Sequence, residues 1–246
     1  MAGQRSPALW LLAVAGAGWL LLVWLAFDMG HPLAQLTMPG TPHWAMANVL
    51  AIVAMWGVMM AAMMLPSALP VVQAFGVLCQ RNGEPERWRS FVVAYLSVWL
   101  LFSLAASAVQ WGLQAVEWVD PMIVSTSVPL NAALLIIAGV YQFTPLKRAC
   151  LAHCRSPMAF LLGEWRTGVR GGFVMGLRHG LVCLGCCWAL MALLFVGGVM
   201  NLAWITALSI VVAIERLAPH GERIAWVLGL LLIAAGASRI GVLAGG

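Results

Sequence analysis

The chain has 246 residues, of which 63% are hydrophobic and only 9% are charged, and its mean hydropathy is +0.96. Soluble domains are roughly half apolar and about a quarter charged. The composition therefore excludes an ordinary soluble fold and favours a protein that is surrounded by lipid. The formal net charge is +5, but the basic residues lie between the apolar runs. That distribution indicates membrane topology and argues against a nucleic-acid partner.

Seven apolar segments are expected to cross the membrane as helices, because a span requires about 20 predominantly apolar residues. In chain order they are residues 8–27, 44–79, 91–113, 129–143, 172–199, 202–214 and 224–240. Pro66 and Pro70 are expected to kink the second segment or to divide it. The first segment is long enough to span, so we expect it to be retained and not removed as a signal peptide. The predicted fold is an all-α polytopic bundle forming a single integral membrane domain over residues 1–246.

Lysine and arginine alternate between the connections of these segments. Arg5 precedes the first segment, and residues 80–90, 144–171 and 215–223 are basic connections, whereas the connections between them carry no lysine or arginine. Basic connections stay on the cytoplasmic side of a membrane. This pattern predicts an inner N-terminus and an outer C-terminus in a bacterial cytoplasmic (inner) membrane, with Arg239 as the exception.

The fifth segment carries metal-binding side chains on one helical face. At about 100° per residue, Met175, His179, Cys183, Cys186 and Cys187 fall within an arc of about 120°. Thiolate, thioether and imidazole together favour copper(I), with zinc as the alternative. Cysteine is also a small hydrophobic residue that packs well, so helix packing is the competing interpretation.

Three glycines in the same segment recur every four residues, at Gly172, Gly176 and Gly180. A face of small residues lets a neighbouring helix approach closely. A metal site needs such a neighbour, because one helix cannot surround an ion.

The second segment contains the closely spaced methionines Met59, Met60, Met63 and Met64. Thioethers at this helical spacing can act as successive weak ligands for copper(I), although methionine also fills space in apolar cores. Counting residues from each membrane face places these methionines and the cysteines of the fifth segment at similar depth. The two segments could therefore both supply ligands to one site.

Cys150 and Cys154 lie four residues apart in a connection that the topology places inside the cell, where thiols are kept reduced. On a helical turn they face the same way, which predicts a metal-receiving site at the mouth of the bundle. The alternative is that the basic neighbours Lys147, Arg148 and Arg155 lower the pKa of the thiols. Cys79 is expected to be structural.

Charged residues near the end of the sixth segment are interpreted as structural. Glu215 is expected to pair with Arg216 or with Arg178, and Arg178 is expected to be buried.

Four motifs together resemble a bacterial family of predicted metal-binding integral membrane proteins, a domain of otherwise undefined function. They are MMAAMMLP at 59–66, YQFTPLK at 141–147, GLRHG at 176–180 and CLGCCW at 183–188. The resemblance covers about residues 46–217. It implies metal binding and carries no established activity.

Three functions stay open at this point. The first is a protein that binds copper(I) for transport or delivery and exchanges it with a donor or acceptor protein. The second is a membrane oxidoreductase or oxidase subunit with a fixed copper centre, which the presence of only His179 at membrane depth disfavours. The third is a packing or assembly subunit without metal. Whether the chain is an enzyme is left open.

Overall fold

The computed structural model describes residues 7–41 and 43–245, with side chains described up to residue 241, so Arg5 lies outside the described residues. The helices are α1 (Pro7–Phe27), α2 (Pro32–Thr37), α3 (Met46–Arg81), α4 (Arg87–Ala115), α5 (Val128–Tyr141), α6 (Pro145–Arg155), α7 (Pro157–Gly163), α8 (Gly168–Ala192), α9 (Leu194–Gly197), α10 (Leu202–Leu217) and α11 (Gly221–Gly245). Apart from an isolated bridge between Val119 and Ser125, this part of the chain holds no β-structure. The predicted all-α class is confirmed.

Five helical stretches of the described chain are long and apolar enough to cross a membrane. They are α1, α3, α4, α8 continued by α9, and α11. The pair α5 and α6, bent by 64°, raises the number to six if it counts as one span. The sixth predicted segment corresponds to α10, which has only 16 residues, so a count of seven is not confirmed. The predicted division of the second segment is not observed, because α3 runs through Pro66 and Pro70 as one helix of 36 residues.

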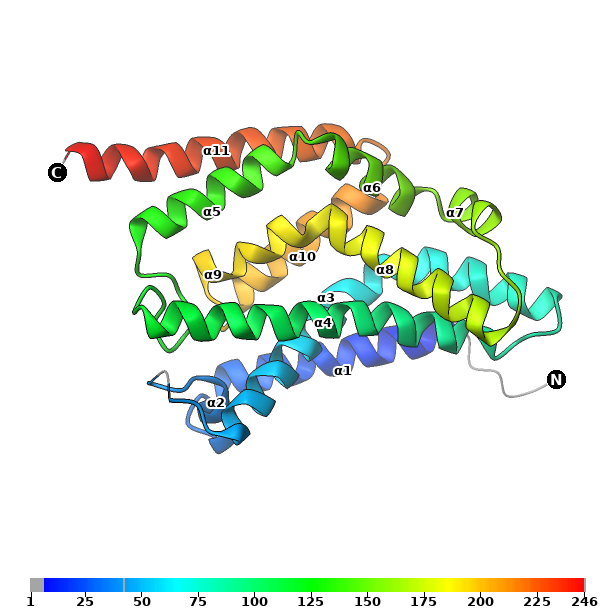
Figure 1. Cartoon of the computed structure of the whole chain (residues 1–246), viewed down its shortest axis with the longest axis horizontal. Coiled ribbons are helices and arrows are strands. Elements are labelled where there is room, and N and C mark those ends of the chain that lie inside the picture. Colours follow the sequence, from blue (N-terminus) through cyan, green and yellow to red (C-terminus); the bar gives the residue numbers. More distant parts are fainter. Residues whose placement is uncertain (1–6, 42, 246) are drawn as a thin grey trace.

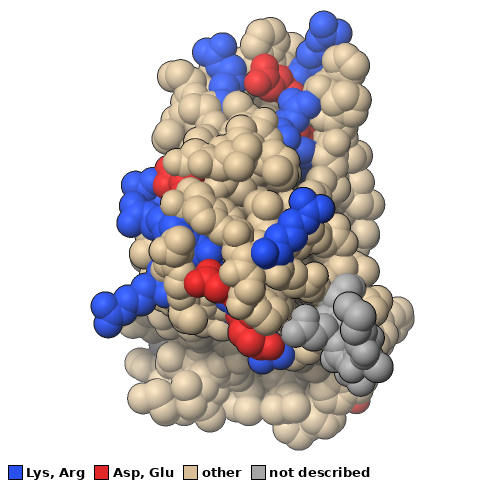
Figure 2. All heavy atoms as spheres, turned by 90° about the vertical axis from the view of Figure 1, so that its right-hand side faces the viewer, with Lys and Arg blue, Asp and Glu red and all other residues tan. Residues whose placement is uncertain are grey.

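The long helices lie alongside one another, and the connections gather at the two ends of the bundle (Figure 1). Three connecting regions lie toward the same end of the bundle. They are the turn between α3 and α4, the α6–α7 region, and the turn between α10 and α11. Figure 2 looks at this end and shows lysines and arginines spread across it. Along the flanks, large apolar side chains such as Leu20, Leu101 and Leu230 are exposed. An apolar flank with charged ends is the surface that a bilayer requires.

Helix α8 packs closely against α4 along the predicted glycine face. A Cβ atom added at Gly172 would lie 2.5 Å from Ser90 Oγ, and one added at Gly180 would lie 2.8 Å from Val98 Cγ2. A Cβ atom at Gly176 would meet the Phe91 carbonyl oxygen even more closely. The close neighbour that this glycine face predicts is therefore α4. Atoms of α4 leave no space for a side chain at positions 172, 176 and 180 of α8.

Alanine at position 176 should lower the free energy of unfolding by about 1–3 kcal/mol or more, because the added methyl group would push the α4 backbone away. The midpoint of thermal unfolding in detergent measures this effect. Gly112→Ala is the matched control, since a Cβ atom at that helical glycine has no neighbour within 4 Å. It should be neutral or slightly stabilising, and equal midpoints for the two variants would contradict the close packing.

Candidate metal centre

All five predicted donors of α8 are buried, with exposed fractions of 0% for Met175 and Cys183, 3% for His179, and 1% for Cys186 and Cys187. Helix α8 contacts α4, α6, α5 and α10, so this donor face points into the bundle. The predicted arc is thus a real buried face. The neighbours of each donor differ, however, and these neighbours separate the donors into distinct environments.

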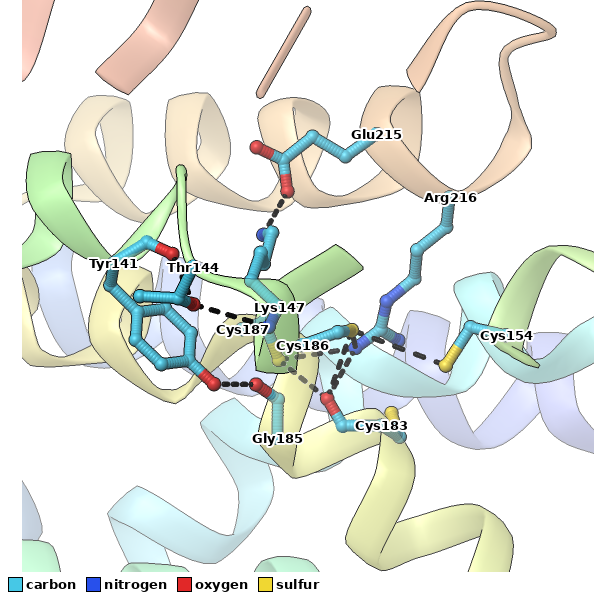
Figure 3. Close-up of polar contacts among 10 residues, drawn as sticks. All are labelled: Tyr141, Thr144, Lys147, Cys154, Cys183, Gly185, Cys186, Cys187, Glu215 and Arg216. Carbon is cyan, nitrogen blue, oxygen red and sulfur yellow. Dashed lines mark hydrogen bonds and ion pairs between the residues drawn. The ribbon is translucent and has the colours of Figure 1, made fainter. Parts of the chain in front are cut away.

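Cys186 and Cys187 share the guanidinium group of Arg216 on α10 (Figure 3). Arg216 Nη2 lies 3.1 Å from the Sγ atoms of both cysteines and donates to the Cys183 carbonyl oxygen at 2.9 Å. Its Nη1 donates to Ser67 Oγ of α3 at 2.7 Å. Arg216 therefore joins three helices at the cysteine cluster. Sequence reasoning missed this role and assigned Arg216 only as a partner for Glu215.

Cys154 of α6 reaches the same cluster. Its Sγ atom lies 4.0 Å from the Sγ atom of Cys186 (Figure 3). Thr144 starts α6 by accepting a hydrogen bond from the Lys147 amide at 3.2 Å, and this cap sets where the helix begins. The sequence pattern predicts that Cys154 and Cys186 belong to two separate sites. The structure brings the two side chains together.

Cys150 lies against α8 but at another point. A Cβ atom added at Gly185 would be 2.9 Å from Cys150 Sγ, so the small residue at 185 lets α6 approach. Tyr141, which precedes α6, donates a short hydrogen bond to the Gly185 carbonyl oxygen (Figure 3). These contacts hold α6 on α8 and keep Cys154 close to Cys186.

Cys183 has a different partner. Its Sγ atom lies 3.0 Å from Tyr95 Oη, and Tyr95 donates its single hydroxyl proton to the Met64 carbonyl oxygen at 3.2 Å. The Cys183 thiol is then the donor to Tyr95, which satisfies that thiol within the protein. The same tyrosine links the backbone of Met64 on α3 to the Cys183 thiol on α8, so these parts of the methionine and cysteine segments lie at a similar depth, as expected.

The methionines of α3 are buried, with exposed fractions of 0% for Met59, Met60 and Met64 and 3% for Met63. Burial agrees with a role either as ligands or as core packing. Met175 has a partner of its own, because its Sδ atom accepts a hydrogen bond from Arg87 Nη2 of α4 at 3.7 Å.

His179 sits in an aromatic surrounding. The centroids of the Phe91, Tyr95 and Phe160 rings lie 5.8, 5.8 and 5.2 Å from the centroid of the His179 ring. Its Nδ1 atom is buried without a hydrogen-bond partner in the structure. Buried polar atoms are nearly always paired, so this nitrogen is free to bind a ligand or a water molecule.

The predicted partner of Glu215 is wrong. Glu215 pairs with Lys147 of α6 at 2.6 Å, and the exposed fraction of both side chains is 1%. Residues 215 and 216 are about 100° apart around α10, so Glu215 faces Lys147 while Arg216 faces the cysteines. Arg178 is half-exposed and pairs with Glu164, which also corrects the expectation that it is buried.

Across residues 7–41 and 43–245, no three His, Cys, Asp or Glu side chains are arranged to hold a metal ion. Structural zinc requires four ligands in a tetrahedron, so the arrangement does not favour zinc. Two metal–sulfur bonds of about 2.3 Å span up to about 4.6 Å, and the 4.0 Å between Cys154 and Cys186 lies within that reach. The pair fits a soft ion that accepts few sulfur ligands, as copper(I) does.

The chain belongs to the PpoB2 family of copper chaperones. The match covers residues 53–238 and so includes the methionine segment, α6, α8 and Arg216. The expected resemblance to a metal-binding family is confirmed to this extent, and the family description favours copper while giving zinc no support. Neither a curated protein nor a solved structure matches the chain.

Proposed function

We propose that this member of the PpoB2 family is a membrane protein that binds copper(I) as cargo between Cys154 and Cys186 and delivers it to another site. The observation that carries the proposal is the 4.0 Å separation of the two Sγ atoms, which come from different helices. Copper(I) prefers soft thiolate ligands, and both sulfurs would bind it as thiolates. A fixed copper enzyme is less well supported, because His179 is the single histidine among the buried residues of the described chain.

The positions of the two cysteines suit a cargo site. Cys154 is half-buried on α6, which lies toward the basic end of the bundle (Figure 1), whereas Cys186 has an exposed fraction of 1%. A donor or acceptor protein would exchange the ion first with Cys154, and Cys186 would hold it inside. Met59, Met60, Met63 and Met64 are proposed as weaker ligands deeper in the bundle, reached past Tyr95 and Cys183. His179 is proposed as a further donor around the site and Cys150 as a support for α6. Cys187 is proposed to stay a thiol outside the ligand set, because it donates to the Cys183 carbonyl oxygen.

We also propose that the membrane is the bacterial cytoplasmic membrane, with the basic end inside. Support comes from the apolar flanks, from the helices long enough to span, and from the basic connections gathered at one end. Helix α10 would then be a seventh, shorter crossing between α9 and α11. The N-terminus lies inside and the C-terminus outside under this arrangement, as the distribution of lysine and arginine predicts.

Copper content measured by mass spectrometry tests the site. We expect wild-type protein, purified in detergent under reducing conditions with copper supplied, to hold about one copper ion per chain. The double variant Cys154→Ser with Cys186→Ser should lose it. Cys79→Ser is the matched control, because Cys79 is as buried as Cys186 but lies on α3 and forms no hydrogen bond with another cysteine of the described chain.

Circular dichroism should show the same helix content in all three proteins. Equal copper in the double variant and the wild type would refute the proposed site. Absence of copper from every protein would leave the packing role as the better interpretation.

A further inference from the structure

Arg216 is a buried cation without an acidic partner. Its exposed fraction is 5%, and no Asp or Glu forms an ion pair with it in the described part of the chain. Its hydrogen bonds go to a serine hydroxyl, a carbonyl oxygen and the two sulfurs of Cys186 and Cys187. A guanidinium group stays protonated in proteins. The charge must therefore be balanced by something other than a carboxylate.

The neighbouring charged residues do not supply that balance. Lys147 and Glu215 are the other buried charges beside the cluster, and they pair with each other at 2.6 Å, so their charges cancel. The remaining groups that can become negative next to Arg216 are the cysteine thiols.

Counting charges then distinguishes between ions. Two thiolates, one guanidinium and a monovalent cation sum to zero. The same groups with a divalent cation leave one positive charge buried without a partner, which is unfavourable. With three thiolates the site would be neutral with a divalent ion instead. Cys183 and Cys187 do not supply the third thiolate, because the Cys183 thiol donates to Tyr95 and the Cys187 thiol donates to the Cys183 carbonyl oxygen.

We propose that Arg216 is a specificity-determining residue, which makes the Cys154–Cys186 site a receptor for monovalent soft cations and rejects divalent ones. This inference rests on the proposed function, since it concerns the same two sulfurs. Arg216 does not bind the ion. It holds a fixed positive charge beside Cys186 and so selects the cation whose charge makes the buried site neutral.

Silver(I) and cadmium(II) are both soft ions with filled d shells, but they differ in charge. Comparing their binding therefore measures the effect of ion charge at similar softness. Dissociation constants for each ion can be measured on the full chain in detergent by competition with a thiol chelator. For Arg216→Gln we expect the silver affinity to fall at least about tenfold and the cadmium affinity to stay or rise. Arg216→Lys keeps the positive charge. The ratio of its silver and cadmium dissociation constants should stay within about threefold of the wild-type ratio.

Arg89→Gln is the matched control, since Arg89 is 67% exposed, pairs with Glu86 and forms no hydrogen bond or ion pair with Cys154 or Cys186 in the described chain. It should leave both affinities unchanged. If Arg216→Gln lowers both affinities equally, Arg216 is only structural and the inference is overturned. If the wild type binds neither ion, the proposed function itself fails.

Cys187→Ser keeps the inference testable even if Arg216→Gln does not fold. The charge count with two thiolates predicts that this variant retains silver binding and the wild-type ratio. Loss of silver binding in Cys187→Ser would show a third thiolate and would overturn the selectivity argument.

Discussion

Glutamine in place of Glu215 should lower the free energy of unfolding by about 3–5 kcal/mol, because it leaves the Lys147 ammonium group buried without its carboxylate. The two charged atoms are 2.6 Å apart, and each side chain is 1% exposed. Water cannot replace the lost partner at that depth. The midpoint of denaturant unfolding in detergent, followed by circular dichroism, measures the change.

Glu86→Gln is the control for this prediction. Glu86 also pairs with a basic residue, Arg89, but their side chains are 60% and 67% exposed. An exposed pair contributes about 0–1 kcal/mol, so this substitution should have little effect. The double variant Lys147→Met with Glu215→Leu should recover much of the stability, because apolar residues can replace a buried ion pair. Equal losses for Glu215→Gln and Glu86→Gln would contradict the buried pair.

Mild oxidation of the reduced, metal-free protein with diamide should join Cys154 to Cys186. Their Sγ atoms are 4.0 Å apart, so closing to a disulfide bond of about 2 Å needs only a small movement of two side chains. The product can be identified by mass spectrometry of the linked peptides. We expect most of the chains to carry this link, and bound silver(I) should prevent it by occupying the same sulfurs.

Serine variants show whether the link is specific. Cys154→Ser should abolish it, whereas Cys150→Ser should leave it in place, although both cysteines lie on the same face of α6. A dominant link between Cys150 and Cys154 would mean that α6 does not hold Cys154 against α8 as the structure shows. Such a result would also remove the geometric basis of the proposed copper site.

Several features of the fold follow from the sequence because they depend on local periodicity and composition. Apolar runs of sufficient length predict the long helices, and the spacing of basic connections predicts which connections meet at one end. The face of Gly172, Gly176 and Gly180 predicts a close neighbour, and the structure identifies that neighbour as α4. The buried donor face of α8 is likewise a consequence of about 3.6 residues per turn.

The tertiary structure alone decides which of these donors meet. Cys154 and Cys186 are 32 residues apart, and Arg216 is 30 residues from Cys186. No local pattern predicts such pairings, because they depend on how α6, α8 and α10 pack. Residues 215 and 216 illustrate the reason: adjacent in sequence, they point about 100° apart on a helix. One forms a buried ion pair with Lys147 while the other places a positive charge among the cysteines. Sequence therefore determined the helices and their buried faces, and helix packing determined the chemistry between them.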